Sequence, residues 1–129
     1  MGTEQAVERL RSVAAQYRGL QLLMLYGSRA RGEEHARSDW DIGYLADRTL
    51  NSFALLGEVT QVLQTDAVDL VDLERASGLL RFRAASEGLV VYESAAGAYH
   101  DFAVAAALYW YDVEPIVRRT HDDILARLG

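Results

Sequence analysis

The residues best suited to chemistry lie in two short motifs. Gly27-Ser28 follows an apolar run, and Asp39-Trp40-Asp41 begins after ten further residues. Alternate side chains of an extended strand share a face, so Asp39 and Asp41 point to one side and Trp40 points to the other. Two adjacent carboxylates repel each other, and a bound divalent cation relieves that repulsion. Mg²⁺ is the natural candidate, because it takes one or two carboxylates and completes its shell with water and phosphate oxygens.

Gly27 and Ser28 supply the other half of a phosphate site. A glycine directly after a buried strand lets the backbone approach a phosphate, and a helix beginning at about Ser28 aims free N–H groups at it. The Ser28 hydroxyl adds a donor, and Arg29 and Arg31 each offer a bidentate guanidinium. Either motif alone is weak, since Gly-Ser turns are common and acidic residues also line exposed strand edges. Together they predict a metal-assisted phosphate site and therefore a nucleotide.

Other polar residues have weaker claims to a site. Arg37 and Ser38 precede the paired carboxylates, and a polar loop explains them equally well. His35 lies in the same loop, whereas His100 and His121 lie in the C-terminal segment without a partner at metal-ligand spacing. We expect surface or packing roles for all three histidines.

The composition narrows the possible mechanisms. The chain has 129 residues, 50% hydrophobic and 25% charged, which indicates one globular domain. Its net charge of −6 argues against extended binding to a nucleic-acid backbone. All 13 basic residues are arginine and there is no cysteine, which excludes lysine bases, phosphate-loop lysines, disulfides and thiol nucleophiles. Arginine, backbone amides and Mg²⁺ remain as the phosphate binders.

Helices and strands alternate among the elements that must position these residues. Residues 4–18 place apolar side chains at helical spacing, with Thr3 available as N-cap. Residues 20–26 form an almost unbroken apolar run between two glycines, which indicates a strand buried on both faces. Pro115 must kink the last helical segment or begin a new helix. The remaining expectations are strands over 40–46, 67–73 and 89–93, helices over 50–64 and 76–87, and helical structure from 95 to 128.

These elements predict a mixed α/β (α+β) fold in which helices pack on one small sheet of about four strands. We expect a single domain over 1–129, with a core at about 1–93 and a helical extension at about 95–128. No segment reaches 18 apolar residues, and the first residues lack the pattern of a secretory signal. The expected location is therefore cytoplasmic, away from membranes.

The C-terminal segment is rich in aromatic residues. One helical stripe is expected to pack on the sheet, and Trp110 and Tyr111 fall partly outside it. An exposed aromatic patch there would suit a protein partner or a homodimer, although core packing explains most of the cluster. The stripe consists of Tyr99, Phe102, Ala106, Tyr109 and Val113.

Gly27, Ser28, Asp39 and Asp41, within YGSRARGEEHARSDWDIGYL, resemble the signature of the nucleotidyltransferases related to DNA polymerase β. The short chain and the GSRARG and SDWDI segments are similar to the minimal, MNT-type members. The resemblance covers roughly residues 20–93 and implies the nucleotidyltransferase fold. It also implies two metal ions bridging the triphosphate of ATP, transfer of a nucleotidyl group to an acceptor oxygen, and release of pyrophosphate.

The resemblance further implies a third carboxylate on a neighbouring strand, which holds the catalytic metal and helps to deprotonate the acceptor. Asp66, Asp69 and Asp72 compete for this role. In a strand over 67–73, Asp69 is central and faces away from Asp72. Asp69 also matches the family's Val-Asp-Leu-Val segment better, so we expect Asp69 to complete the metal site.

MNT-type proteins are commonly paired with a HEPN-type RNase toxin and act as its antitoxin, some by adding AMP to a toxin tyrosine. The resemblance thus implies a Mg²⁺-dependent nucleotidyltransferase that moves AMP from ATP to a hydroxyl, on a tyrosine of a cognate toxin. One alternative is a non-catalytic antitoxin that neutralises its partner by docking. A second is a small-molecule nucleotidyltransferase acting on an antibiotic, which the length disfavours because such enzymes normally have an additional substrate domain.

Overall fold

The computed structural model describes residues 1–33 and 38–128. The described chain confirms the expected order of helices and strands. The expected strands over 20–26, 40–46 and 89–93 are present with those bounds, and the third strand is one residue shorter at each end. The elements are α1 (Thr3–Ala14), β1 (Leu20–Tyr26), α2 (Ser28–Arg31), β2 (Trp40–Ala46), α3 (Ser52–Leu63), β3 (Val68–Asp72), α4 (Gly78–Glu87), β4 (Leu89–Glu93) and α5 (Ala98–Leu128).

The four strands form one mixed sheet in the order β3-β2-β1-β4. Strand β1 pairs antiparallel with both β2 and β4, whereas β2 pairs parallel with β3. The apolar run Leu22–Tyr26 is buried because β1 is central and covered on both faces. The expected fold class, a small mixed sheet with packed helices and a C-terminal helical extension, is confirmed.

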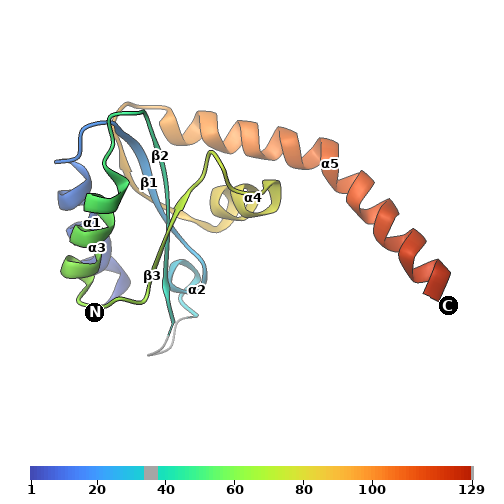
Figure 1. The fold of residues 1–129 in the computed structure, drawn as a ribbon, viewed down its shortest axis with the longest axis horizontal. Coiled ribbons are helices and arrows are strands. Elements are labelled where there is room, and N and C mark those ends of the chain that lie inside the picture. The colour runs from blue at the N-terminus through green and yellow to red at the C-terminus, as the bar shows by residue number, and fades with distance from the viewer. Residues whose placement is uncertain (34–37, 129) are drawn as a thin grey trace.

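Helices α1 and α3 cover one face of the sheet, and α4 and the first part of α5 cover the other (Figure 1). Because successive side chains of a strand point to opposite faces, each strand contributes side chains to both cores. Trp40 and Ile42 join the core beneath α1 and α3, while Leu22 and Met24 join the core beneath α4 and α5. Asp41, which lies between Trp40 and Ile42 along β2, therefore points to the other face of the sheet, towards α4.

Helix α1 differs from the expectation at both ends. Gly2, not Thr3, is the N-cap residue, and the Thr3 hydroxyl donates instead to the Arg29 carbonyl at 3.2 Å. The helix ends at Ala14, four residues early, because the chain must turn back into β1. Gly19 makes that turn at φ +87°, where a Cβ would collide with the Thr49 hydroxyl oxygen.

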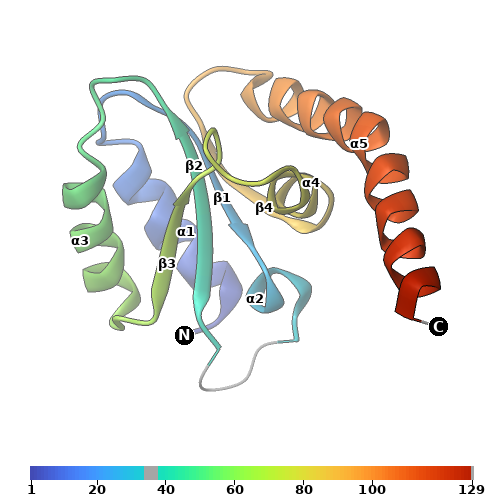
Figure 2. The ribbon, with the colours of Figure 1, turned by 45° about the vertical axis from the view of Figure 1, so that its right-hand side comes forward.

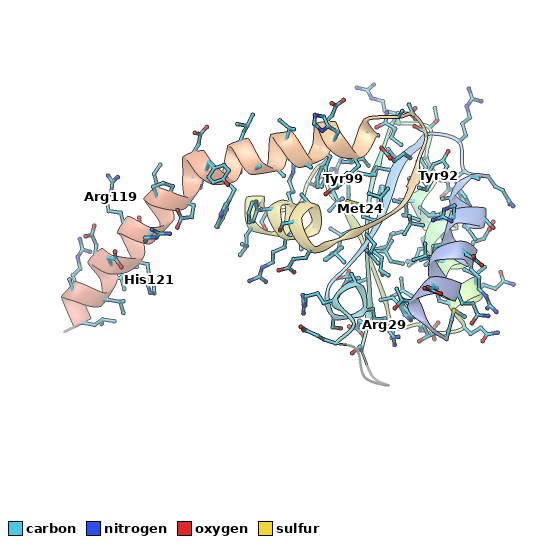
Figure 3. The ribbon with its side chains drawn as sticks, turned by 180° about the vertical axis from the view of Figure 1, so that it is seen from behind. Met24, Arg29, Tyr92, Tyr99, Arg119 and His121 are labelled. Carbon is cyan, nitrogen blue, oxygen red and sulfur yellow. The ribbon has the colours of Figure 1, made fainter. Side chains whose placement is uncertain are left out.

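Helix α5 runs without a break through Pro115, and Figure 2 shows that it bends along its length. Of the two options for Pro115, the kink is therefore correct. The proline has no N–H to donate to the carbonyl four residues back, which permits the bend. The outer part of the helix extends away from the sheet, and Arg119 and His121 project from it in Figure 3. Within the described chain, no helix is long and apolar enough to cross a bilayer.

The aromatic stripe of α5 packs only in part as expected. Phe102 and Ala106 are buried, and the Tyr99 hydroxyl donates to the Ala85 carbonyl at 2.5 Å. Tyr109 is 54% exposed, so its expected packing on the sheet is wrong: at this point α5 has passed the sheet and lies against α4. Trp110, expected partly outside the stripe, stacks on Phe82 of α4 with ring centroids 5.5 Å apart. Tyr111 is 72% exposed and Val113 is half-buried.

Candidate active site

Asp41 and Asp69 lie side by side at one end of the sheet. They are register partners in the parallel pairing of β2 with β3, and both line a cavity of about 250 Å³. Tyr26, the last residue of β1, is the register partner of Asp41 on the other side and lines the same cavity. Trp40 is only 3% exposed and lies in the core of the opposite face, as the alternation of β2 predicts.

The electrostatics of this cavity favour a bound cation. Burial raises the pKa of Asp41, and the negative charges of Asp69 and Asp39 raise it further, against a smaller lowering effect of Arg31. The pKa of the Tyr26 phenol is raised to about 12, first by burial and then by Asp41 and Asp69. Both pKa shifts come first from burial and then from neighbouring negative charge, and a divalent ion bound here would offset the repulsion between the carboxylates.

Oxygen donors of this kind suit Mg²⁺. In residues 1–33 and 38–128, no group of three acidic, histidine or cysteine side chains is placed to hold a metal ion. Mg²⁺ does not require such a cage, because it keeps several waters and binds through one or two carboxylates plus substrate phosphates. Asp41 and Asp69 therefore fit the ion as its main protein ligands. Asp39 is exposed just before β2 and acts on Asp41 through its charge.

Gly27 closes the cavity beside Asp41 and is required there for two reasons. Its φ of +76° and ψ of −159° are accessible almost only to glycine. A Cβ at this position would collide with an Asp41 carboxylate oxygen. The backbone therefore approaches the carboxylate as closely as a chain can, and it then turns directly into α2, which begins at Ser28 as the sequence predicts.

Arg31 is the arginine of α2 that reaches the cavity. Its guanidinium donates to Glu33 and to Glu87, each at 3.1 Å, and so links α2 to α4. Both carboxylates are solvent-exposed, so these ion pairs are weak and open to exchange. The structure thus brings Arg31 to the site with its charge shared between two acidic residues.

Arg29, which the sequence also predicts as a phosphate ligand, is not brought to this cavity. Its guanidinium donates twice to the Ser38 carbonyl, at 3.1 and 2.9 Å, and lies 4.0 Å above the Trp40 ring. Residues two apart on a helix point in nearly opposite directions, so α2 directs Arg29 and Arg31 to different sides. This geometry favours a positioning role for Arg29, holding Ser38 immediately before Asp39.

Helix α4 contributes three residues that sequence reasoning missed. Leu80, Arg83 and Glu87 line the cavity opposite the strands. Their spacing of three and four residues places them on one helical face, and that spacing is the signal that was available. Within the described part of the chain, Arg83 forms no ion pair, so it adds an uncompensated positive charge to the site.

The competing aspartates lie elsewhere. Asp72 pairs in register with Tyr44, accepts from the Glu74 amide at 3.0 Å and lies 3.8 Å from Arg75. Asp66 precedes β3 and does not line the cavity. The geometry thus agrees with the choice of Asp69 as the third carboxylate. His100 and His121 lie exposed on α5, whereas His35 and Arg37 fall outside the described residues.

Comparison with known proteins places this geometry in a family. Residues 8–96 match the family described as polymerase beta, nucleotidyltransferase. The chain is 34% identical over 113 residues to the protein adenylyltransferase MntA of Shewanella oneidensis, covering 83% of this chain and 78% of that one. It is 29% identical over 118 residues to MntA of Aphanizomenon flos-aquae, covering 81% and 78%.

A solved structure described as a toxin-antitoxin with AMP-PNP is similar in fold and in sequence. It superposes with a TM-score of 0.75 at 28% identity, covering 95% of this chain and 98% of that one. The similarity extends through α5, beyond the end of the family match at residue 96. With the carboxylate pair, the glycine turn and the sheet order, these findings show that the chain belongs to the polymerase β-like nucleotidyltransferase family.

Proposed function

We propose that this chain is a Mg²⁺-dependent protein adenylyltransferase, which moves AMP from ATP to a tyrosine hydroxyl of a cognate HEPN-type toxin and so acts as its antitoxin. The observation that carries the proposal is the register pairing of Asp41 with Asp69 beside Gly27, in a cavity that two arginines also line. The names of the relatives support the same activity, since both are protein adenylyltransferases. The similar toxin-antitoxin structure with an ATP analogue supports both the nucleotide and the type of partner.

In this proposal Asp41 and Asp69 hold the metal, and the exposed Asp39, which the sequence predicts as a further ligand, contributes its negative charge. The bound ion supplies positive charge to the triphosphate and promotes ionisation of the acceptor hydroxyl. Asp41 is the innermost carboxylate, fixed between two strands, and Asp69 is exposed on the edge strand β3, where an acceptor can approach. Asp69 is therefore the residue we assign to receive the acceptor proton.

The transfer itself needs orientation more than covalent help from the protein. The tyrosine oxygen bonds to the α-phosphorus of ATP while the bond from that phosphorus to the pyrophosphate oxygen breaks. Gly27 and Ser28 present backbone and hydroxyl donors to the triphosphate, and Arg31 exchanges Glu33 and Glu87 for phosphate oxygens. A nucleotide phosphate competes well for this arginine, because both ion pairs are exposed.

Label transfer tests the proposal. The chain and its partner are incubated with ATP labelled at the α-phosphate, with and without Mg²⁺, and the partner is analysed for AMP on tyrosine. Wild type should label the partner only with Mg²⁺, and the double variant Asp39→Asn/Asp41→Asn should not. Asp72→Asn is the matched control, because Asp72 lies on the same strand as Asp69 but pairs with Tyr44.

The same experiment separates catalysis from docking. If wild type transfers no label and the double variant still neutralises the toxin, the chain is a binding module and the proposed activity is wrong. If transfer occurs to a hydroxylated small molecule and not to the partner, the antibiotic-modifying alternative holds. Loss of both transfer and neutralisation in the double variant supports an antitoxin that acts by adenylylation.

A further inference from the structure

A second cavity lies on the same face of the sheet as the candidate active site, at the opposite end of the strands. Its volume is about 460 Å³, larger than that of the first. It is lined by Gln21 at the start of β1 and Leu45 near the end of β2, whereas the first cavity is lined by the other ends of these strands. The two cavities share no lining residue. Binding in this second cavity is therefore separate from nucleotide binding.

Arg81 of α4 is the unusual residue of this cavity. Its side chain is partly buried, and its Nε atom is fully buried without a hydrogen-bond partner among the described residues. The guanidinium lies 5.6 Å from the centroid of the Phe102 ring. Across residues 1–33 and 38–128, Arg81 takes part in no ion pair. A buried N–H group without an acceptor is costly, and the contact with one aromatic ring does not replace the missing hydrogen bond.

The charged residues that line this cavity indicate the kind of ligand that suits it. The acidic residues Glu74 and Asp101 line the same cavity, but both are solvent-exposed and neither lies within ion-pair distance of Arg81. One positive and two negative side chains thus line the same cavity without pairing with one another, together with the apolar side chains of Leu45 and Phe102. A ligand that matches this arrangement carries an oxyanion at one end and a positive group at the other.

We propose that this cavity is a second binding site, in which Arg81 binds a carboxylate or phosphate group of a molecule that also presents a positive group to Asp101 and Glu74. The molecule is either a small free zwitterion or a protein segment with neighbouring acidic and basic side chains. Both offer the same chemistry to the cavity, which is why the test includes a probe of each kind. The site goes beyond the proposed adenylyl transfer and does not depend on it.

NMR titration of the arginine Nε–Hε signals tests the site. The probes are acetate, 6-aminohexanoate, and a capped Glu-Gly-Lys peptide whose only charges are on its side chains. The Arg81 signal should shift and saturate with all three, with 6-aminohexanoate binding at least about fivefold more tightly than acetate. Asp101→Asn should remove most of that preference. Tighter binding of the peptide than of 6-aminohexanoate indicates a protein segment, and weaker binding indicates a free small molecule.

Two variants keep the test decisive. Arg81→Gln should abolish the saturable shifts of the surrounding amides. If that variant fails to fold, Ala95→Asp serves instead, because Ala95 is an exposed loop residue lining the cavity, and an added carboxylate there should weaken binding at least about tenfold with Arg81 intact. Arg119, on the outer part of α5, is the internal control for non-specific association and should show no saturation.

The proposal is overturned if no probe gives a saturable shift at Arg81, if Arg119 responds equally, or if Ala95→Asp leaves binding unchanged. The double variant Asp41→Asn/Asp69→Asn should bind the probes as wild type does. Retained binding in that variant distinguishes this site from the nucleotide site, so loss of adenylyl transfer neither supports nor contradicts the second site. Lost binding in a folded double variant would show that the two cavities are not independent, and would overturn the proposal as well.

Discussion

The two faces of the sheet differ in how many apolar residues they bury and in the cavities that they carry. Beneath α1 and α3, thirteen of the described residues form one buried apolar cluster, whereas six form the corresponding cluster beneath α4 and α5. The first cluster includes Trp40 and the fully buried Leu10. The second is interrupted by two cavities, which contain Asp41 and Arg81. We call the first the packed face, for its larger buried cluster, and the second the open face, for these two cavities.

The same strand serves both faces. In β2, Trp40 and Ile42 point into the packed core while Asp41, between them, points into the open face. The carboxylate that we propose as a metal ligand is thereby fixed by two buried neighbours whose positions depend on the core. Because side chains alternate along β2, the residues that stabilise the core and the carboxylate of the candidate site lie on opposite faces. Substitutions on the two faces should therefore differ in their effects on stability and on activity.

The largest expected effect is on the open face. Asp41→Asn and Asp69→Asn should each lower adenylyl transfer at least about a thousandfold, equivalent to roughly 4 kcal/mol of transition-state stabilisation, because each removes a metal-holding charge. Initial rates of label transfer to the partner measure this, with thermal denaturation to show that the variants fold. Asp72→Asn should retain most of the activity. Equal losses at Asp69 and Asp72 would contradict the assignment.

The packed face should give the opposite result. Leu10→Ala removes a fully buried side chain and should lower the free energy of unfolding by about 2–5 kcal/mol, with unchanged turnover in the fraction that stays folded. Urea denaturation and activity measured at low temperature separate the two quantities. Leu108→Ala, at a position 61% exposed on α5, is the matched control and should change stability by less than about 0.5 kcal/mol. A turnover defect in folded Leu10→Ala would show that the faces are coupled.

Gly27→Ala should affect both properties, because Gly27 directly follows the central strand β1 and lies beside Asp41. The unfavourable φ and the collision with the Asp41 carboxylate should together cost about 2–3 kcal/mol and displace the metal ligand. Gly32→Ala separates the two causes: Gly32 also has a positive φ of +73°, but a Cβ there meets nothing within 4 Å. Gly32→Ala should therefore show only the smaller conformational cost. Similar activity losses in the two variants would argue against the collision.

Much of the open face could be predicted from the sequence where the signal is local. The apolar run of β1 between two glycines fixed its bounds, and the alternation around Trp40 correctly placed Asp41 on the other face. The position of Asp69 followed once a strand over 67–73 was assumed, because Asp69 and Asp72 must then face opposite ways. The family resemblance supplied the chemistry, which alternation alone does not.

The remainder depends on tertiary contacts that no local pattern encodes. Arg29 and Arg31 are equivalent in sequence, yet the Ser38 carbonyl and the Trp40 ring hold the first away from the cavity. The spacing of Leu80, Arg83 and Glu87 indicates that they share one face of α4, but nothing in residues 76–87 reveals that this face meets the strands. The exposure of Tyr109 depends on where α5 leaves the sheet, which is a property of the whole fold.

The smallest expected effect is on the pH dependence of thermal stability, which reports the repulsion at Asp41 when no cation is bound. The pKa of Asp41 is raised by burial and by Asp69 and Asp39, so the folded state favours the protonated form. The stability this provides is present below the unfolded pKa of about 3.9 and is lost as pH rises through the raised folded pKa. Asp41→Asn, which carries no charge at any pH, should therefore melt slightly above wild type at pH 7 without Mg²⁺, and the difference should shrink towards pH 3.

Asp47 provides the control of opposite sign. Hydrogen bonds from the Thr49 hydroxyl and amide lower its pKa, so its stabilising effect is present above the unfolded pKa and is lost in acid. Asp47→Asn should lower the melting temperature at pH 7 and have little effect at pH 3. Calorimetry of both variants from pH 3 to 7, repeated with Mg²⁺, completes the comparison. Because a bound cation removes the repulsion at Asp41, Mg²⁺ should reduce or reverse the advantage of Asp41→Asn and leave Asp47→Asn unchanged. A melting advantage of Asp41→Asn that is insensitive to Mg²⁺ would argue that no cation binds at this carboxylate.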